Sequence, residues 1–139
     1  MLLILGALAA TPLFAHVIPY ALTFTTSFPF YVGNQYMPAG SYTVTETGLA
    51  GPLFVRDADW KHTTFIQYTP AETSTPVNKG MATFREYGNV AFLHSLTVTG
   101  QASGLDLPDG RREKAIASRA GQERASLNTV PLEPSRSGN

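Results

Sequence analysis

The sequence predicts an all-β protein: an antiparallel β-sandwich or partly open barrel of about seven strands, with a short C-terminal helix and a disordered tail. From Tyr20 onward, apolar side chains alternate with Thr and other polar residues, as in strands of a sheet that is wet on one face. Hydrophobic residues make up 43% of the chain and charged residues 14%, which does not suit a charged helical bundle. Ten Pro and twelve Gly residues indicate frequent turns.

The N-terminus has the pattern of an export signal. The first ten residues, MLLILGALAA, are apolar apart from Gly6, and Thr11-Pro12 ends the run. We predict a signal peptide over residues 1–15 with cleavage after Ala15, and an extracytoplasmic location, periplasmic or secreted. The alternatives are a buried first strand and an uncleaved anchor. Because a bilayer span needs about 20 apolar residues, we expect no stable membrane span after processing.

Residues 16–110 are expected to form the β domain. The alternation predicts strands over residues 20–25, 28–32, 42–45, 53–56, 63–69, 81–87 and 90–98. Pro29 cannot donate to a strand ladder, so its strand either lies at a sheet edge or begins there. Pro38-Ala39-Gly40 and Tyr87-Gly88-Asn89 have the composition of tight turns. This spacing of short strands favours a sandwich or small barrel over βαβ units.

Four segments lack the alternation. We expect residues 70–79 to be a crossover loop between sheets or a lid, and residues 100–104 to be a linker. Residues 111–125 are rich in Ala, and Ile116 is their only large apolar side chain, which predicts a marginal helix with little to bury. Residues 126–139 contain two Pro and several Ser without periodicity, so we predict a disordered tail.

Several short blocks occur in a characteristic order. They are PFYVG at 29–33, MPAGSYTV at 37–44, FREYGN at 84–89, FL at 92–93, LP at 107–108 and REK at 112–114. In this order they resemble a family of small exported proteins of acidobacteria and related soil bacteria, which has no assigned function. The resemblance covers about residues 20–115. It implies export and β architecture, and it supplies no catalytic residue.

Charge is balanced overall but divided along the chain. Ten Lys and Arg match ten Asp and Glu, yet residues 1–110 are net acidic and residues 111–139 are net basic. Basic residues diluted over such a segment are typical of a solvated tail, and contact with an acidic partner is the alternative. We expect no nucleic-acid binding, because the predicted sheet is acidic. The absence of Cys excludes disulfides and thiolate chemistry.

The three histidines do not have metal-ligand spacing. His16, His62 and His94 form neither H-x-H nor H-x-x-x-H. His94 shares strand parity with Phe92 and Leu96, so we expect it at the edge of the core with a hydrogen bond. We expect His62 at the surface.

The acidic Asp57-x-Asp59 pair is predicted to be a turn, because Asp side chains accept hydrogen bonds from local backbone N–H groups. A calcium loop of the EF-hand type would need Glu at the twelfth position, where this chain has Tyr68. We therefore predict no metal and no cofactor.

Catalytic motifs are also missing from the sequence. It contains no G-x-S-x-G elbow and no Gly-rich phosphate loop, so we predict no enzymatic activity. The alternative is a small extracytoplasmic hydrolase with Glu86, His62 or Asp59 as an acid or base at a loop end. The simpler interpretation of Glu86 is a surface pair with Arg85.

Aromatic residues are the most suggestive class. Tyr31, Tyr36, Trp60 and Tyr68 lie opposite core positions or near loops, where rings stack on sugars or contact other proteins; alternatively, they cap the open ends of the sandwich. We predict a non-catalytic exported binding or structural module, with these four residues as its candidate ligand-binding set. The partner would be a protein or glycan surface. A further alternative is a subunit that associates with itself through an edge strand.

Overall fold

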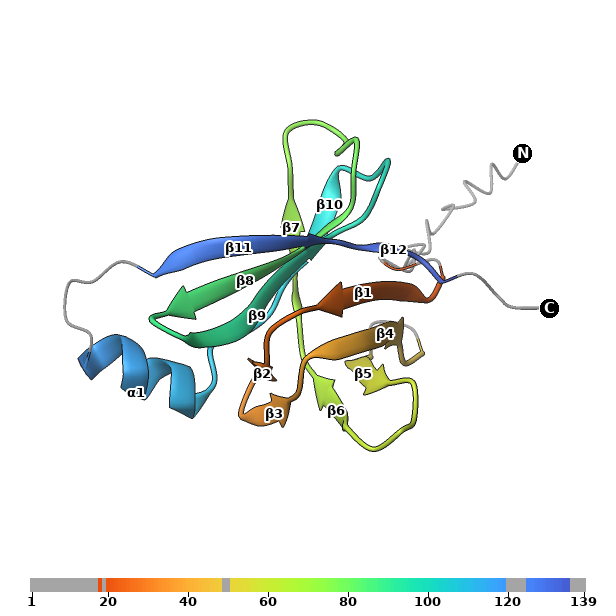
Figure 1. The fold of residues 1–139 in the computed structure, drawn as a ribbon. Coiled ribbons are helices and arrows are strands. Elements are labelled where there is room, and N and C mark those ends of the chain that lie inside the picture. Colours follow the sequence, from red (N-terminus) through yellow and green to blue (C-terminus); the bar gives the residue numbers. More distant parts are fainter. Residues whose placement is uncertain (1–17, 19, 49–50, 120–124, 136–139) are drawn as a thin grey trace, which may run out of the picture.

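The protein folds as two β-sheets with one short helix at an end of the sandwich (Figure 1). This computed structural model describes residues 18, 20–48, 51–119 and 125–135. The predicted all-β sandwich is confirmed, and neither sheet closes into a barrel. The predicted signal peptide, residues 1–15, lies outside the described residues. No helix in the described ranges is both long and apolar enough to cross a membrane.

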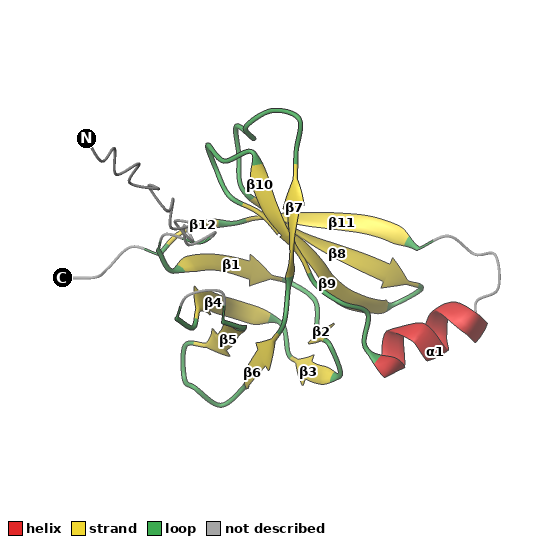
Figure 2. Ribbon diagram, turned by 180° about the vertical axis from the view of Figure 1, so that it is seen from behind, coloured by secondary structure: helices red, strands yellow, loops and turns green. Residues whose placement is uncertain are grey.

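The first sheet has five strands, in the spatial order β12 (Glu133–Pro134), β1 (Leu22–Thr26), β4 (Gly40–Glu46), β5 (Leu53–Asp57) and β6 (Thr63–Ile66). The second sheet runs β11 (Ser126–Pro131), β8 (Met81–Tyr87), β9 (Val90–Thr97), β10 (Ser103–Asp106) and β7 (Thr69–Glu72). A hairpin of β2 (Phe30–Val32) and β3 (Gln35–Met37) joins β9 by a parallel contact. Helix α1 (Arg111–Arg119) follows β10, and Figure 2 shows it beside the ends of β8 and β9.

The core lies between the sheets and is built from alternate residues of β1, β4, β5 and β8, with residues of other strands added to them. Val44 and Val55 of the first sheet and Ala82 and Leu96 of the second are fully buried. Burial of a large aliphatic or aromatic side chain contributes roughly 1.5–3 kcal/mol. The alternation therefore determines which face of each strand turns inward.

Five aromatic rings connect the two sheets at the centre of this core. Phe84 of β8 lies 5.1 Å, between ring centroids, from both Phe28 and Phe30. Phe24 of β1 packs on Tyr42 of β4 at 5.7 Å and on Phe84 at 5.9 Å. The rings thus link strands of both sheets in one contact network.

A β-bulge in β9 changes which residues face the core. Thr83 is opposite Ser95 and Phe84 is opposite Leu93, so His94 is the extra residue. The side chain of Phe92 does not point into the core between the sheets. It is buried on the opposite face of β9, where its ring stacks on that of Tyr31. The predicted common parity of His94, Phe92 and Leu96 is therefore wrong, because the bulge shifts the alternation.

The prediction of a disordered tail over 126–139 is wrong for residues 126–135. β11 pairs with nearly all of β8, from Ser126 opposite Glu86 to Pro131 opposite Met81. Leu132 then enters the core, and its backbone N–H donates to the carbonyl of Gly80 at 3.0 Å. Backbone pairing and one buried Leu hold this segment, and neither produces a periodic pattern.

Two further loop predictions are wrong in part. Residues 69–72 form β7 and residues 103–106 form β10, and these two strands pair with one another. The predicted strand over 63–69 is divided, because the chain leaves the first sheet after Ile66 and enters the second at Thr69. Pro70 is accommodated because β7 is an edge strand. With β3, β11 and β12, these elements raise the count in the described residues above the seven strands predicted.

The predicted helix is confirmed for residues 111–119. Residues 120–124 lie outside the described residues, and Ala125 is not helical. Within α1 the one fully buried side chain is Glu113, a carboxylate, while Ile116 is only half-buried. The helix is therefore not held by an apolar stripe, and the polar contacts that hold it shape the site described next.

Candidate functional site

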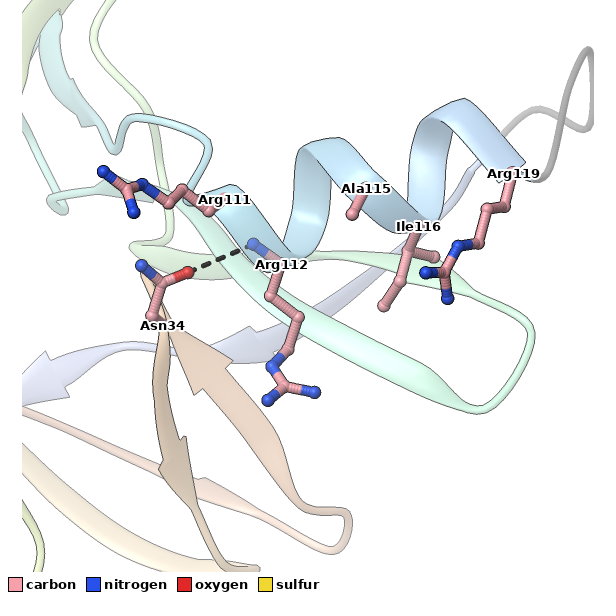
Figure 3. A pocket seen from close by; sticks show the side chains of 6 residues that line it. All are labelled: Asn34, Arg111, Arg112, Ala115, Ile116 and Arg119. Atoms are coloured by element: carbon pink, nitrogen blue, oxygen red, sulfur yellow. Dashed lines mark hydrogen bonds between the residues drawn. The ribbon is translucent and has the colours of Figure 1, made fainter.

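An open groove of about 570 Å³ runs along α1 and reaches the turn between β2 and β3 (Figure 3). Its lining consists of Asn34, Arg111, Arg112, Ala115, Ile116 and Arg119. Arg112, Ile116 and Arg119 have the i, i+4, i+7 spacing that places side chains on one helix face, and Figure 3 shows them on one side of α1. Among the described residues, three guanidinium groups and no carboxylate line this groove.

The first turn of α1 is capped by a residue far away in the chain. The Arg112 backbone N–H donates to Asn34 Oδ1 at 3.1 Å, so Asn34 acts as the N-terminal cap from the β2–β3 turn. This contact requires a residue without a side chain at position 110. A Cβ added to Gly110 would lie 2.8 Å from Asn34 Oδ1 and 3.0 Å from the carbonyl carbon of Gly33.

Gly110→Ala is therefore expected to lower the free energy of unfolding by about 1–2 kcal/mol, the range for loss of a helix cap. Without the clash, the same change would stabilise the protein by about 0.4–1 kcal/mol, because Ala lowers the conformational entropy of the unfolded chain relative to Gly. Urea denaturation followed by circular dichroism measures the sign. In an Asn34→Ala background, Gly110→Ala should lower the free energy of unfolding by less, because the clash of the new Cβ with Asn34 Oδ1 is absent. Stabilisation by Gly110→Ala in the natural background would contradict the cap.

Tyr31 and Tyr36 meet beside the groove. They are opposite one another in the β2–β3 hairpin, and their ring centroids lie 5.7 Å apart. The Arg112 guanidinium lies over the Tyr31 ring, 4.8 Å from its centroid, in a cation–π contact. A second hollow of about 180 Å³ lies here, lined by Pro29, Tyr31, Tyr36, Asn89, Val90 and Ala91. Two of the four predicted ligand-binding aromatics are thus brought together next to arginines that we did not predict as ligand-binding residues.

Beneath the groove, a charged network fastens α1 to the second sheet. Arg85 Nη1 lies 3.1 Å from Glu113 Oε1 and 3.0 Å from Asp109 Oδ1. The Tyr87 hydroxyl also donates to Glu113, at 3.2 Å. Burial raises the pKa of the Glu113 carboxyl, and Asp109 raises it further against the opposing effect of Arg85. Glu113 is thus directed inward and paired, so the groove side of α1 keeps its positive charge.

His94 completes this network at the bulge. Arg85 Nη2 lies 3.1 Å from His94 Nε2, and because a guanidinium only donates, Nε2 accepts and the imidazole is neutral. Burial lowers the pKa of His94, and the charge of Arg85 lowers it further. Its Nδ1 is buried and has no hydrogen-bond partner among the described residues. The hydrogen bond predicted for His94 is confirmed, but its side chain lies on the face of β9 that turns toward Arg85 and α1, not on the core face.

The predicted surface pair of Arg85 and Glu86 is wrong. Successive residues of a strand point to opposite faces. Arg85 faces α1, whereas Glu86 accepts a hydrogen bond from Asn128 of β11 at 3.0 Å.

The other two predicted aromatics lie elsewhere. Trp60, in the turn between β5 and β6, belongs to a cluster with Phe54 and Phe65 on the outer face of the first sheet. Tyr68 packs against the core, and its hydroxyl donates to Glu46. Burial, followed by the interaction with Glu46, raises the pKa of Tyr68 to about 12. Tyr68 is thus a structural residue, and it does not line the hollow that contains Tyr31 and Tyr36.

The residues of the predicted hydrolase alternative do not converge. His62 Nδ1 lies 2.8 Å from Asp57 Oδ2, in the turn after β5. The other Asp57 oxygen accepts from the backbone N–H groups of Lys61 and His62, which confirms the predicted Asp turn. The hydrogen bond with His62 lowers the pKa of Asp57.

Glu86 lies on β8, in the other sheet, and Asp59 is exposed in the turn. Neither they nor His62 line the groove or the Tyr31 hollow. Within the described ranges, no group of three His, Asp or Glu side chains could hold a metal ion. The groove along α1, with the Tyr31 hollow beside it, therefore remains the candidate site.

Comparison with known proteins assigns no function to this groove. No protein-family model, no curated protein and no solved structure matches the chain.

Proposed function

We propose that the protein is an exported, non-catalytic binding module that takes an acidic glycan in the groove along α1. The observation that carries this proposal is the described part of the groove lining, which contains Arg111, Arg112 and Arg119 and no carboxylate. Guanidinium groups bind carboxylates with two parallel hydrogen bonds, which favours an anionic ligand. The proposal includes removal of residues 1–15 on export and kinship with the acidobacterial exported family.

A glycan fits the neighbouring residues better than a small enclosed anion. The groove is open, whereas sites for small molecules usually surround most of the ligand surface. Tyr31 and Tyr36 supply aromatic rings next to Arg112, and the apolar faces of sugar rings pack on such side chains. Asn34 holds the helix start in place at the end of the groove. An acidic polysaccharide would thus meet charge from α1 and rings from the β2–β3 hairpin.

The test is calorimetric titration of the mature chain, residues 16–139, with polygalacturonate and with its fully methyl-esterified, neutral form. We expect binding of the acidic polymer only, weakened by added salt because the contacts are charged. Arg112→Gln with Arg119→Gln should reduce affinity at least about tenfold, since each lost charge-assisted hydrogen bond is worth about 1.5–3 kcal/mol.

Lys114→Gln is the matched control for this titration. Lys114 is exposed on the same helix and does not line the groove, so its loss removes one positive charge but no proposed contact. We expect the affinity to change less than about threefold, because the lost charge acts on the polymer only through its long-range field. An equal loss with Lys114→Gln, equal binding of the neutral polymer, or no binding of polygalacturonate would contradict the proposal.

A further inference from the structure

Of the four strands that end the two sheets, only β6 lacks proline. β7 contains Pro70, β11 ends at Pro131 and β12 ends at Pro134. Proline removes a backbone donor, and proteins use it at exposed edges to prevent pairing with another chain. β3, the outer strand of the side hairpin, has three residues and is followed directly by Pro38. The sequence Thr63–Ile66 of β6 therefore forms the least protected edge in the described part of the chain.

The side chains of β6 carry no charge, and the most exposed large side chains near this edge are apolar. Phe65 is 62% exposed and Trp60 is 61% exposed, two of the most exposed large hydrophobic residues. Phe65 is opposite Phe54 in register, and their ring centroids are 4.7 Å apart. Phe54 also contacts Trp60 at 5.7 Å. We name these three residues the β6 aromatic patch.

We propose that a second copy of this chain pairs with β6 in antiparallel orientation, about a two-fold axis at Phe65. Directly opposite residues of antiparallel strands share a face, so this register places Phe65 against the partner's Phe65. The row of rings from Phe54 to Phe65 then continues into the same row of the partner, and the two five-stranded sheets become one.

The absence of charge on β6 favours a second copy of this chain as its pairing partner. The four residues of β6 carry no charge, so a two-fold arrangement brings no like charges together along the strand. A two-fold interface is also self-complementary and closes at the dimer, whereas unlimited addition would need a second open edge. The other sheet ends do not offer one, because they contain Pro70, Pro131 and Pro134.

The size of the patch indicates a weak dimer. Large aromatic side chains bury about 150–250 Å² each, so the exposed parts of Phe65 and Trp60 supply much less than the roughly 800 Å² per partner of a standard interface. Backbone pairing of a four-residue strand adds to this area. We therefore expect reversible association with a Kd on the order of 0.1 mM.

Sedimentation velocity of the mature chain, from about tenfold below to tenfold above that Kd, should show a concentration-dependent shift from monomer to dimer. Phe65→Lys should abolish the shift. Leu127→Lys is the matched control, because Leu127 is 66% exposed on β11, an edge that ends in proline, and the shift should persist. A monomer at all concentrations, a dimer that survives Phe65→Lys, or an equal loss with Leu127→Lys would overturn the proposal.

Cysteine cross-linking tests the register independently of stability. The natural chain contains no Cys, so Phe65→Cys introduces a single thiol. Opposite Cα atoms in an antiparallel pair lie about 4.5–5.5 Å apart, within the range of a disulfide. Under mild oxidation Phe65→Cys should form a disulfide dimer at least about tenfold faster than Leu127→Cys. Pairing of the two strands holds the thiols at position 65 together and so raises their effective concentration. Equal rates would refute pairing at Phe65, whatever the outcome of the glycan titration.

Discussion

Arg85→Met is expected to lower the free energy of unfolding by about 3 kcal/mol and to release α1 from the sheet. The cost arises because the Glu113 carboxylate stays buried after its partner Arg85 is removed. Glu113 is 4% exposed, and without the guanidinium it keeps a buried carboxylate next to Asp109 with only the Tyr87 hydroxyl as a donor. The value is at the low end for breaking a buried ion pair, because the Arg85 side chain is itself 24% exposed.

Urea denaturation and the helical signal in circular dichroism measure this effect. Glu113→Gln removes the stranded charge, so the double variant Arg85→Met, Glu113→Gln should be less destabilised than the sum of the single variants. Arg56→Met is the control: Arg56 lies over the exposed ring of Trp60, and its loss should cost less than about 1 kcal/mol. Additive effects of Arg85 and Glu113 would show that they do not act as a pair.

The alternation of apolar and hydroxyl side chains was sufficient to predict the sandwich, because burial decides which face of a strand turns inward. Phe24 on β1 and Val44 on β4 follow that rule and reach the core. The rule fails at His94, where the bulge inserts one residue and exchanges the two faces of β9. A bulge depends on the partner strand, so a pattern within one strand does not reveal it.

Segments held by backbone pairing were not predictable from periodicity. β7 and β10 pair with each other across a gap of thirty residues in the chain, and β11 returns to pair with β8. The side chains of β7 and β11 are mostly exposed, and β10 has Leu105 as its one buried apolar side chain, so no apolar alternation marks these strands. Leu132, the one fully buried residue of 125–135, is not enough to form a pattern.

The candidate site was predicted only in part for the same reason. Tyr31 was expected to point away from the core, and it does so beside Tyr36. The arginines of α1 resemble a solvated tail in the sequence, and only the fold brings them to the β2–β3 turn. That placement depends on Asn34, 78 residues before Arg112, and on the pair of Arg85 with Glu113. Such long-range polar contacts have no local signature.

Phe84→Ala is expected to lower the free energy of unfolding by about 3–5 kcal/mol, the largest effect of any single substitution considered. Phe84 has no exposed surface, and its ring contacts those of Phe24, Phe28 and Phe30. Truncation removes the ring that connects β8 to Phe24 on β1 of the other sheet. The surrounding rings are fixed by their own strands, so they fill the cavity only in part, and the cost exceeds the transfer free energy of the lost atoms.

Phe65→Ala provides the matched comparison, since it makes the same chemical change on a side chain that is 62% exposed. Its cost should stay near the ±0.5 kcal/mol typical of surface positions when unfolding is measured well below the concentration at which the chain associates. The difference between the two variants isolates the contribution of burial between the sheets. Similar costs for Phe84→Ala and Phe65→Ala would mean that the sheets do not meet at this ring. The sandwich would then need another source of stability, because no disulfide is available in a chain without cysteine.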